Sequence, residues 1–291
     1  MVPRILVTAF TAIVMAVPVL AEDVEIKTTH VAGHVYVLEG YGGNIGVSVG
    51  DDGILLVDDQ FANIADKIRA ALAAVKKGDV SFILNTHFHG DHTGGNTVFG
   101  HEAVIIAHDN VRQRLSTPQQ MWGETRDPMD AVAWPVVTFD EAVSVHFNGE
   151  EIKLFHLPNG HTDGDALVYF TGSNVLHMGD LLFSGIFPYV DLEHGGTVEG
   201  FVANQEKVLA MGLPADVKVI AGHGPLSTLD HVRDSVGMIR ATTALIRKEI
   251  DAGKSLEDIQ KAGLPETFAS WDWSFITTDR WIETIWNTYA E

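Results

Sequence analysis

Cysteine is absent from the 291-residue sequence. Its absence excludes disulfide bridges, thiolate nucleophiles and thiolate metal ligands. Stability must therefore come from the packed core, which a chain of this length with 46% hydrophobic residues can supply. Low-complexity stretches and repeats of 20–50 residues are also missing, which argues against a solenoid or a disordered chain. A globular protein is expected.

Basic residues are scarce, with 19 Lys and Arg against 39 Asp and Glu and a formal net charge of −20. Such a surface repels nucleic acid and anionic lipid. We therefore expect a small-molecule substrate and no nucleic-acid partner. The sequence contains neither a serine-nucleophile motif nor a dinucleotide-binding glycine motif.

The N-terminus has the order of a secretory signal peptide: a basic Arg4, the apolar residues 5–17, a breaking Pro18 and the small-residue end 19–21. A membrane anchor is the alternative, but the apolar run is only about 13–16 residues, short of the ~20 that span a bilayer. We predict a signal peptide at 1–21 and a mature domain at 22–291. The mature protein would be periplasmic or secreted, without stable membrane contact.

The hydrophobic pattern predicts two β-rich halves, each ending in helices. Asp51-Asp52-Gly53 is a turn signal between strands at 45–49 and 53–58. The continuous apolar run 54–57 is typical of a strand that is buried on both faces. Further strands are predicted at 80–84, 143–147, 151–156, 166–171, 174–178 and 216–220, and helices at 62–76, 199–211, 229–252 and 277–290. This interleaving predicts β-sheets in a sandwich covered by helices.

Two long segments, 117–135 and 183–196, are rich in aromatic residues and show no regular pattern. Such segments are either binding loops or small satellite cores. As binding loops, they would place Trp122 and Tyr189 at the substrate. His194, in the second loop, would face substrate or serve a structural role. The aromatic residues at 271–273 fit either role, whereas those of the last helix recur at core-packing spacing.

The chemistry resides in four short motifs rich in histidine, aspartate and glycine, each directly after or close to the end of a predicted strand. The densest is His-Phe-His-Gly-Asp-His at 87–92. The others contain His161, Asp180 and His223, with His177 near Asp180 as a residue that could orient a ligand or serve a structural role. Strand ends converge at a sheet edge, so these side chains can meet. Imidazole and carboxylate are ligands that suit zinc.

A single histidine after a strand is usually a core or surface residue, and Asp180 alone could stabilise a turn. The 87–92 run differs, because three imidazoles and a carboxylate within six residues would repel one another or remain solvated without a bound ion. This motif therefore predicts a metal site.

The four motifs, in this order, resemble the metallo-β-lactamase superfamily, and the resemblance covers nearly the whole mature chain. It implies an α/β fold, the αββα sandwich, with metals at one edge of the sheets. It also implies two Zn2+ per chain. The first would bind His87, His89 and His161, the second Asp91, His92 and His223, and Asp180 would bridge them.

The sequence departs from the best-known zinc β-lactamases at Asp180. One subclass has cysteine there, and another has a histidine like His92 but lacks the bridging aspartate. The Asp180 pattern is more similar to hydroxyacylglutathione hydrolase and the lactonases. The resemblance thus defines the fold and the metals better than the substrate.

Two zinc ions would lower the pKa of a shared water from 15.7 toward ~7, giving hydroxide that attacks a carbonyl. Asp91 would be catalytic by steering or accepting a proton. Export favours a β-lactamase-like hydrolase of a cyclic amide or ester. The alternatives are a lactonase or thioesterase, a mononuclear iron dioxygenase using His87, His161 and Asp180, and a non-catalytic periplasmic metal-binding protein.

Overall fold

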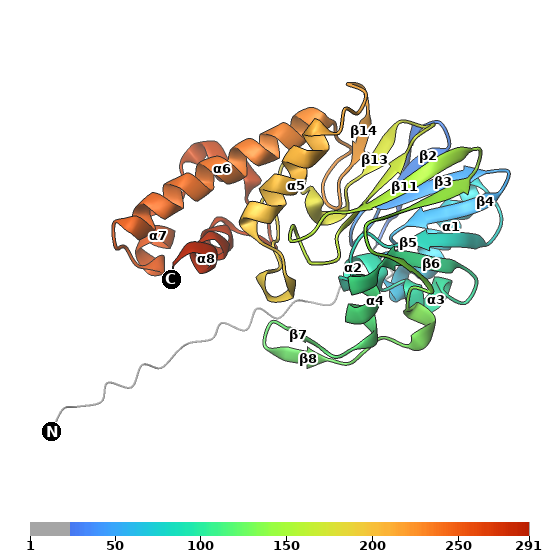
Figure 1. Cartoon of the computed structure of the whole chain (residues 1–291), viewed down its shortest axis with the longest axis horizontal. Helices are drawn as coiled ribbons and strands as arrows, with labels where there is room; N and C mark the ends of the chain where they lie inside the picture. Colours follow the sequence, from blue (N-terminus) through green and yellow to red (C-terminus); the bar gives the residue numbers. More distant parts are fainter. Residues whose placement is uncertain (1–23, 291) are drawn as a thin grey trace.

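The computed structural model describes residues 24–290, in which two β-sheets pack face to face and helices cover their outer faces (Figure 1). The first sheet has seven strands, antiparallel at its start and parallel from β4 onward. In spatial order these are β1 (Lys27–Ala32), β2 (Val35–Glu39), β3 (Ile45–Gly50), β4 (Gly53–Val57), β5 (Val80–Leu84), β6 (Val104–His108) and β9 (Val137–Phe139).

The second sheet has five strands in sequence order, and a separate two-stranded hairpin projects beyond the sheets. The strands of the five-stranded sheet are β10 (Ala142–Phe147), β11 (Glu150–His156), β12 (Ala166–Phe170), β13 (Val175–His177) and β14 (Lys218–Ile220). The hairpin consists of β7 (Gln119–Met121) and β8 (Glu124–Arg126). Only β13 and β14 pair in parallel within the five-stranded sheet.

Eight α-helices and five 3-10 helices occur in the described chain, and the last three α-helices follow the last strand. The α-helices are α1 (Ala65–Val75), α2 (Gly90–Thr93), α3 (Asn96–Phe99), α4 (Asp109–Ser116), α5 (Val198–Ala210), α6 (Leu229–Asp251), α7 (Leu256–Ala262) and α8 (Thr278–Tyr289). The short 3-10 helices are Ala62–Ile64, Ala131–Ala133, Gly179–Leu181, Leu192–His194 and Glu266–Trp271. Within residues 24–290, none of the helices has the length and apolar character needed to cross a membrane.

Strand β4 shows why the sheets form inner layers. Leu55 and Val57 belong to the core between the two sheets, whereas Ile54 and Leu56 pack in the core under α1. All four side chains are fully buried. A strand with two dry faces requires an unbroken apolar sequence, which confirms the prediction for residues 54–57.

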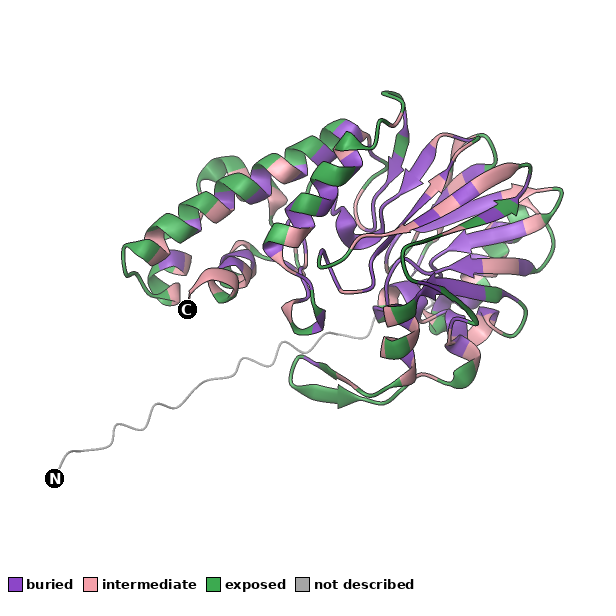
Figure 2. Cartoon of the chain, viewed as in Figure 1, coloured by how far each residue is buried: buried purple, intermediate pink, exposed green. Residues whose placement is uncertain are grey.

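Helices α5 and α6 form the outer layer on the five-stranded sheet, as α1 does on the seven-stranded sheet. Leu176 and Val219 of that sheet pack against Val208 of α5 and Val232 of α6. Farther out, α5 to α8 share a separate core around the buried Trp281, so burial continues well beyond the sheets (Figure 2). The order helix, sheet, sheet, helix confirms the predicted αββα sandwich.

Most predicted elements match the structure within a few residues, but several short elements were missed. Strands β6 and β9, helices α4 and α7, and the β7–β8 hairpin were not predicted. The hairpin lies inside 117–135, a segment expected to lack regular structure, and its strands are too short for an alternating pattern. The predicted signal peptide at 1–21 lies outside the described residues.

Candidate metal centre

The predicted metal ligands come from loops at one edge of both sheets. His87 and His89 follow β5, and α2 begins immediately afterwards. His161 lies in the loop between β11 and β12, Asp180 in the turn after β13, and His223 in the loop after β14. The structure therefore brings together all seven predicted residues from four separate segments.

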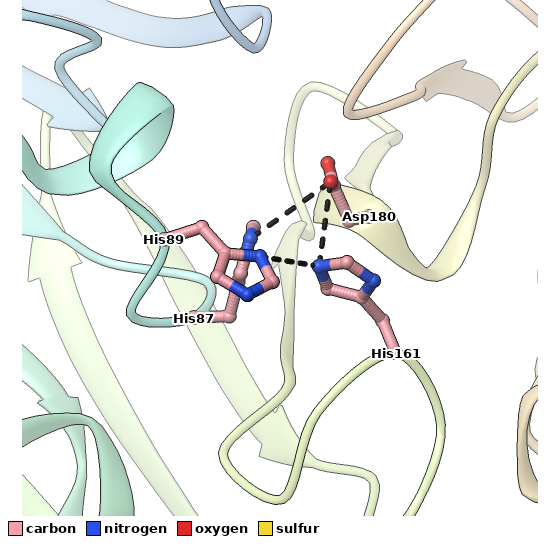
Figure 3. A group of neighbouring side chains, drawn as sticks. All are labelled: His87, His89, His161 and Asp180. Atoms are coloured by element: carbon pink, nitrogen blue, oxygen red, sulfur yellow. Dashed lines mark hydrogen bonds and ion pairs between the residues drawn. The ribbon is translucent and has the colours of Figure 1, made fainter. Parts of the chain in front are cut away.

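Four of these residues form a first cluster, in which one ligand atom of each lies within 4.8 Å of the others. Figure 3 shows the three imidazoles and the carboxylate facing a common point. The Nδ1 of His89 lies 2.8 Å from Nε2 of His161, and Asp180 Oδ2 lies 3.5 Å from that same nitrogen. His87 Nε2 is 3.8 Å from Asp180 Oδ2.

Asp91, His92 and His223 form a second cluster, of three residues, whose ligand atoms also lie within 4.8 Å of one another. His223 Nε2 lies 3.2 Å from Asp91 Oδ2 and 3.4 Å from His92 Nε2. Asp180 reaches this cluster too, since its Oδ1 is 3.0 Å from His92 Nε2. Its carboxylate thus lies between the two clusters, in the position of a shared ligand.

The donor atoms fit divalent metal ions. His87 Nε2 is buried and has no hydrogen-bond partner among the described residues. His89 and His161 donate their outer ring N–H groups to Asp191 and to the Tyr189 carbonyl, so the two ring nitrogens that face each other at 2.8 Å both carry lone pairs when these rings are neutral. Buried nitrogen and carboxylate donors that converge without satisfying one another are the chemistry of a metal site.

Burial and mutual charge tune these groups for metal binding. Burial lowers the pKa of His87 and brings the pKa of His161 to about 4, so both imidazoles are neutral and offer lone pairs at neutral pH. Burial would raise the pKa of Asp180, but the surrounding histidines hold it well below its usual value. For His223, burial alone would lower the pKa, but the Asp180 and Asp91 carboxylates raise it to about 9. His223 is therefore protonated at neutral pH, and a metal ion must displace that proton in order to bind.

Two further carboxylates, which sequence reasoning missed, hold ligand histidines from behind. Asp58 Oδ2 lies 2.8 Å from His92 Nδ1 and also accepts the Thr86 hydroxyl at 2.7 Å. Asp191 Oδ2 lies 2.8 Å from His89 Nε2. Both carboxylates are fully buried, and each fixes which ring nitrogen faces the cluster. The Tyr189 carbonyl holds the His161 ring similarly, at 2.8 Å from Nδ1.

Asp165 shapes the loop that carries His161. Its carboxylate accepts hydrogen bonds from the backbone N–H of His161 at 2.6 Å and of Thr162 at 2.9 and 3.0 Å. The side chain is buried, and burial raises its pKa to about 8. Asp165 belongs to the motif that was recognised in the sequence, but its role depends on the folded turn.

His177 supports the metal loops, as the sequence suggested. Its Nδ1 accepts the Gly179 N–H at 3.1 Å, which leaves Nε2 to donate to the Asn44 carbonyl at 3.0 Å. Asn44 in turn donates to the carbonyls of Ala221 and Gly224, on either side of His223. His177 and Asn44 together connect the loops of Asp180 and His223.

The backbone approaches the ligands so closely that two glycines are required. A Cβ atom at Gly43 would lie 2.1 Å from His92 Cε1, and one at Gly222 would lie 2.0 Å from Asp180 Oδ1. Neither ligand can retreat, because both are fully packed.

The two aromatic loops combine both expected roles. Phe183 and Phe187 are buried in the core of the C-terminal helices, whereas the Tyr189 ring lies 5.6 Å from the rings of His89 and His161. Trp122, at the β7–β8 turn, is 52% exposed and touches Tyr189 rather than the clusters. His194 does not face the substrate side: it is buried.

The position of His194 has a simple physical reason. Its Nδ1 lies 2.7 Å from Asp191 Oδ2, and its ring packs at 5.0 Å from Phe88. The ring therefore lies behind His89 and shares the carboxylate that holds it. A short turn of 3-10 helix places it there, and the sequence pattern does not reveal that turn.

Comparison with known proteins agrees with this geometry. The family model described as the metallo-beta-lactamase superfamily matches residues 38–223, which include all seven cluster residues. The chain belongs to this superfamily of metallo-hydrolases.

Among curated relatives, an uncharacterized protein of Aquifex aeolicus is 32% identical over 171 residues, covering 58% of this chain and 78% of the relative. The hydroxyacylglutathione hydrolase of Pelagibacter ubique is 29% identical over 148 residues, 50% of this chain and 52% of the relative. The chain thus matches only about half the length of that enzyme.

Solved structures show the same fold. A metallo-beta-lactamase from Pontibacter korlensis superposes with a TM-score of 0.61 at 14% identity, covering 74% of this chain and 99% of the other. A double mutant of a sec-alkyl sulfatase gives a TM-score of 0.67 at 14% identity, covering 91% and 50%. At this identity, the likeness concerns the fold alone.

Proposed function

We propose that the chain is an exported dinuclear zinc hydrolase that cleaves a small cyclic amide or ester, with a β-lactam as the first candidate. The observation that carries this proposal is the position of Asp180, whose two carboxylate oxygens lie between the two clusters. A shared carboxylate holds two metal ions close enough to act on one substrate. The iron dioxygenase alternative needs only one cluster and leaves Asp91, His92 and His223 without a role.

Two divalent metal ions at this site supply Lewis acidity and lower the pKa of water. The residues of the chain then position the reactants and accept a proton. Asp91 is the most exposed of the seven side chains, at 30%, and is therefore placed to take the proton from the attacking water. The buried carboxylates Asp58 and Asp191 keep His92 and His89 oriented during this transfer.

A thioester or lactone is the second candidate bond. Asp180 in place of a cysteine resembles hydroxyacylglutathione hydrolases, and several such enzymes are among the relatives. Glutathione thioesters are made mainly in the cytoplasm, so the predicted export of the chain favours a β-lactam or a lactone over that particular substrate. Residues 1–21, on which export depends, lie outside the described part.

One panel of measurements tests these proposals. The purified mature protein is analysed for zinc, iron and manganese, and is assayed with a chromogenic cephalosporin, a lactone and a thioester. We expect about two zinc ions per chain, because seven ligands suffice for two sites. We also expect turnover of the cephalosporin or the lactone. One iron ion per chain would contradict the zinc assignment, and hydrolysis of none of the three compounds would contradict the proposed function.

A further inference from the structure

A cluster of aromatic rings lies directly beside the metal residues, and part of it comes from the C-terminal segment. We call Tyr189, Trp273 and Phe275 the aromatic wall. Tyr189 belongs to the 183–196 loop, whereas the other two precede α8. The Phe275 ring lies 5.6 Å from Tyr189 and 5.5 Å from Trp273, so the three form one continuous surface.

The aromatic wall touches both metal clusters. At one end, the Tyr189 ring is 5.6 Å from His89 of the first cluster. At the other end, the Trp273 ring is 6.0 Å from His223 of the second cluster. An apolar group attached to a carbonyl that reacts between the clusters would therefore meet these rings.

The C-terminal part of the wall is held firmly in place. Trp273 Nε1 donates to the Phe187 carbonyl at 2.9 Å, and Phe187 N–H donates to the Trp271 carbonyl at 2.7 Å. Arg280 Nη1 donates to the Phe275 carbonyl at 2.9 Å, and its guanidinium lies 4.5 Å from that ring. The wall is thus preorganised rather than dependent on a ligand for its order.

Burial distinguishes the wall from the helical core behind it. Trp281 and Phe187, which stack in that core, are fully buried. Tyr189, Trp273 and Phe275 are all only partly buried, although each makes several ring contacts. Partly exposed, rigid aromatic rings next to polar catalytic groups are the usual composition of a small-molecule site.

We infer that Trp273 and Phe275, together with Tyr189, bind an apolar or aromatic group next to the scissile carbonyl and so determine substrate specificity. This inference rests on the proposed hydrolase function and specifies its substrate class. The C-terminal segment before α8 is then part of the substrate site. An apolar substrate group that packs well against these rings should raise kcat/KM about tenfold over a substrate that lacks the group, as apolar sites generally do.

The test compares substrates that differ only in the acyl group. Acetyl, butyryl and phenylacetyl esters with one leaving group are assayed with wild type, Phe275→Ala and Trp273→Ala. We expect kcat/KM in wild type to rise about tenfold from acetyl to phenylacetyl. That preference should disappear in both variants, with unchanged zinc content. Phe268→Ala is the matched control, because Phe268 packs in the same helical core and is not part of the aromatic wall.

A binding measurement separates this inference from the proposed function. Phenylacetate and acetate are titrated calorimetrically into the zinc-loaded protein, which requires no turnover. Tighter binding of phenylacetate that is lost in Phe275→Ala supports the wall even if no ester is hydrolysed. If the alanine variant does not fold, it is replaced by Phe275→Leu, which removes the aromatic ring but keeps an apolar side chain. Equal affinities for the two carboxylates in wild type, or a preference retained in the folded variants, would overturn the inference.

Discussion

His89 and Asp191 are joined by a buried contact of 2.8 Å between Nε2 and Oδ2, although 102 positions separate them in the sequence. The same carboxylate oxygen lies 2.7 Å from Nδ1 of His194. Asp191 therefore holds two histidine rings at once and directs the Nδ1 of His89 toward the first cluster. Burial would raise the pKa of Asp191, but its contact with His89 lowers the pKa to about 2, which keeps the carboxylate charged.

Asp191→Asn should weaken metal binding at the first cluster by about 10- to 100-fold, the usual effect of losing a partner behind a metal ligand. The amide oxygen can still accept the N–H groups of Glu193 and His194, as the carboxylate does. Local folding should therefore persist. Competition with a chromophoric zinc chelator measures the affinity. Asp230→Asn, at an exposed ion pair, is the control, and an affinity equal to that of the control would rule out this role for Asp191.

The sequence predicted the seven cluster residues because each belongs to a compact local motif at a strand end. His87 to His92 span only six positions, and glycines mark the other three motifs. The long strand and helix patterns were equally visible. Ile54 to Val57, for example, form an apolar run that only a doubly covered strand explains.

The supporting residues could not be predicted in the same way. Asp58 lies 34 positions from His92, and neither motif indicates the contact. Asp191 meets His89 only after the two sheets have packed and the 183–196 loop has folded back. Short elements such as β9, with three residues, carry too little pattern to identify, and they depend on pairing with a neighbour.

Gly43→Ala should disrupt the second cluster, because its Cβ would lie 2.1 Å from His92 Cε1. The expected cost is about 1–3 kcal/mol in the free energy of unfolding, together with loss of one metal ion. Gly237→Ala is the matched control. Gly237 is exposed within α6, where an added Cβ meets open space, so alanine should stabilise the protein by about 0.5–1 kcal/mol. Urea unfolding measures the change in the free energy of unfolding for both variants. Equal changes for the two substitutions would refute the steric argument.

Trp122→Ala and Tyr189→Ala should each raise KM about fivefold, which corresponds to ~1 kcal/mol of lost ring contact. Metal content should change little, because the His161 ring is held by the Tyr189 backbone carbonyl, which alanine retains. Steady-state kinetics and elemental analysis check this. Tyr169→Ala, in strand β12, is the control. Unaltered kinetics in both variants would mean that these rings only pack the loops.

The mature protein should begin at Glu22 and be recovered from the periplasm or the medium. The basis is the apolar run that ends in Val19-Leu20-Ala21. Expression of the full-length chain, followed by fractionation and N-terminal sequencing, provides the measurement. A membrane-bound form that retains Met1 would establish an anchor instead of a cleaved signal.

Asp180→Ala should abolish hydrolysis and leave the fold intact, because Asp180 is the one proposed ligand that the two clusters share. Its removal takes one carboxylate ligand from each cluster, so about one zinc ion or fewer should remain. Zinc content, circular dichroism and turnover are measured side by side with wild type. If the alanine variant keeps both zinc ions and near-normal turnover, Asp180 is a turn residue and not a shared ligand.

Asp180→Cys distinguishes a shared ligand from a ligand of one ion. A thiolate binds zinc well but lacks the second oxygen with which the carboxylate reaches the other cluster. Asp180 Oδ1 lies 3.0 Å from His92 Nε2, so a sulfur atom at this position remains closest to the second cluster. The cysteine variant should therefore retain the second zinc ion better than the alanine variant, and its substrate preference should move toward β-lactams. Equal zinc content in the two variants would show that the side chain at 180 does not contact the second ion.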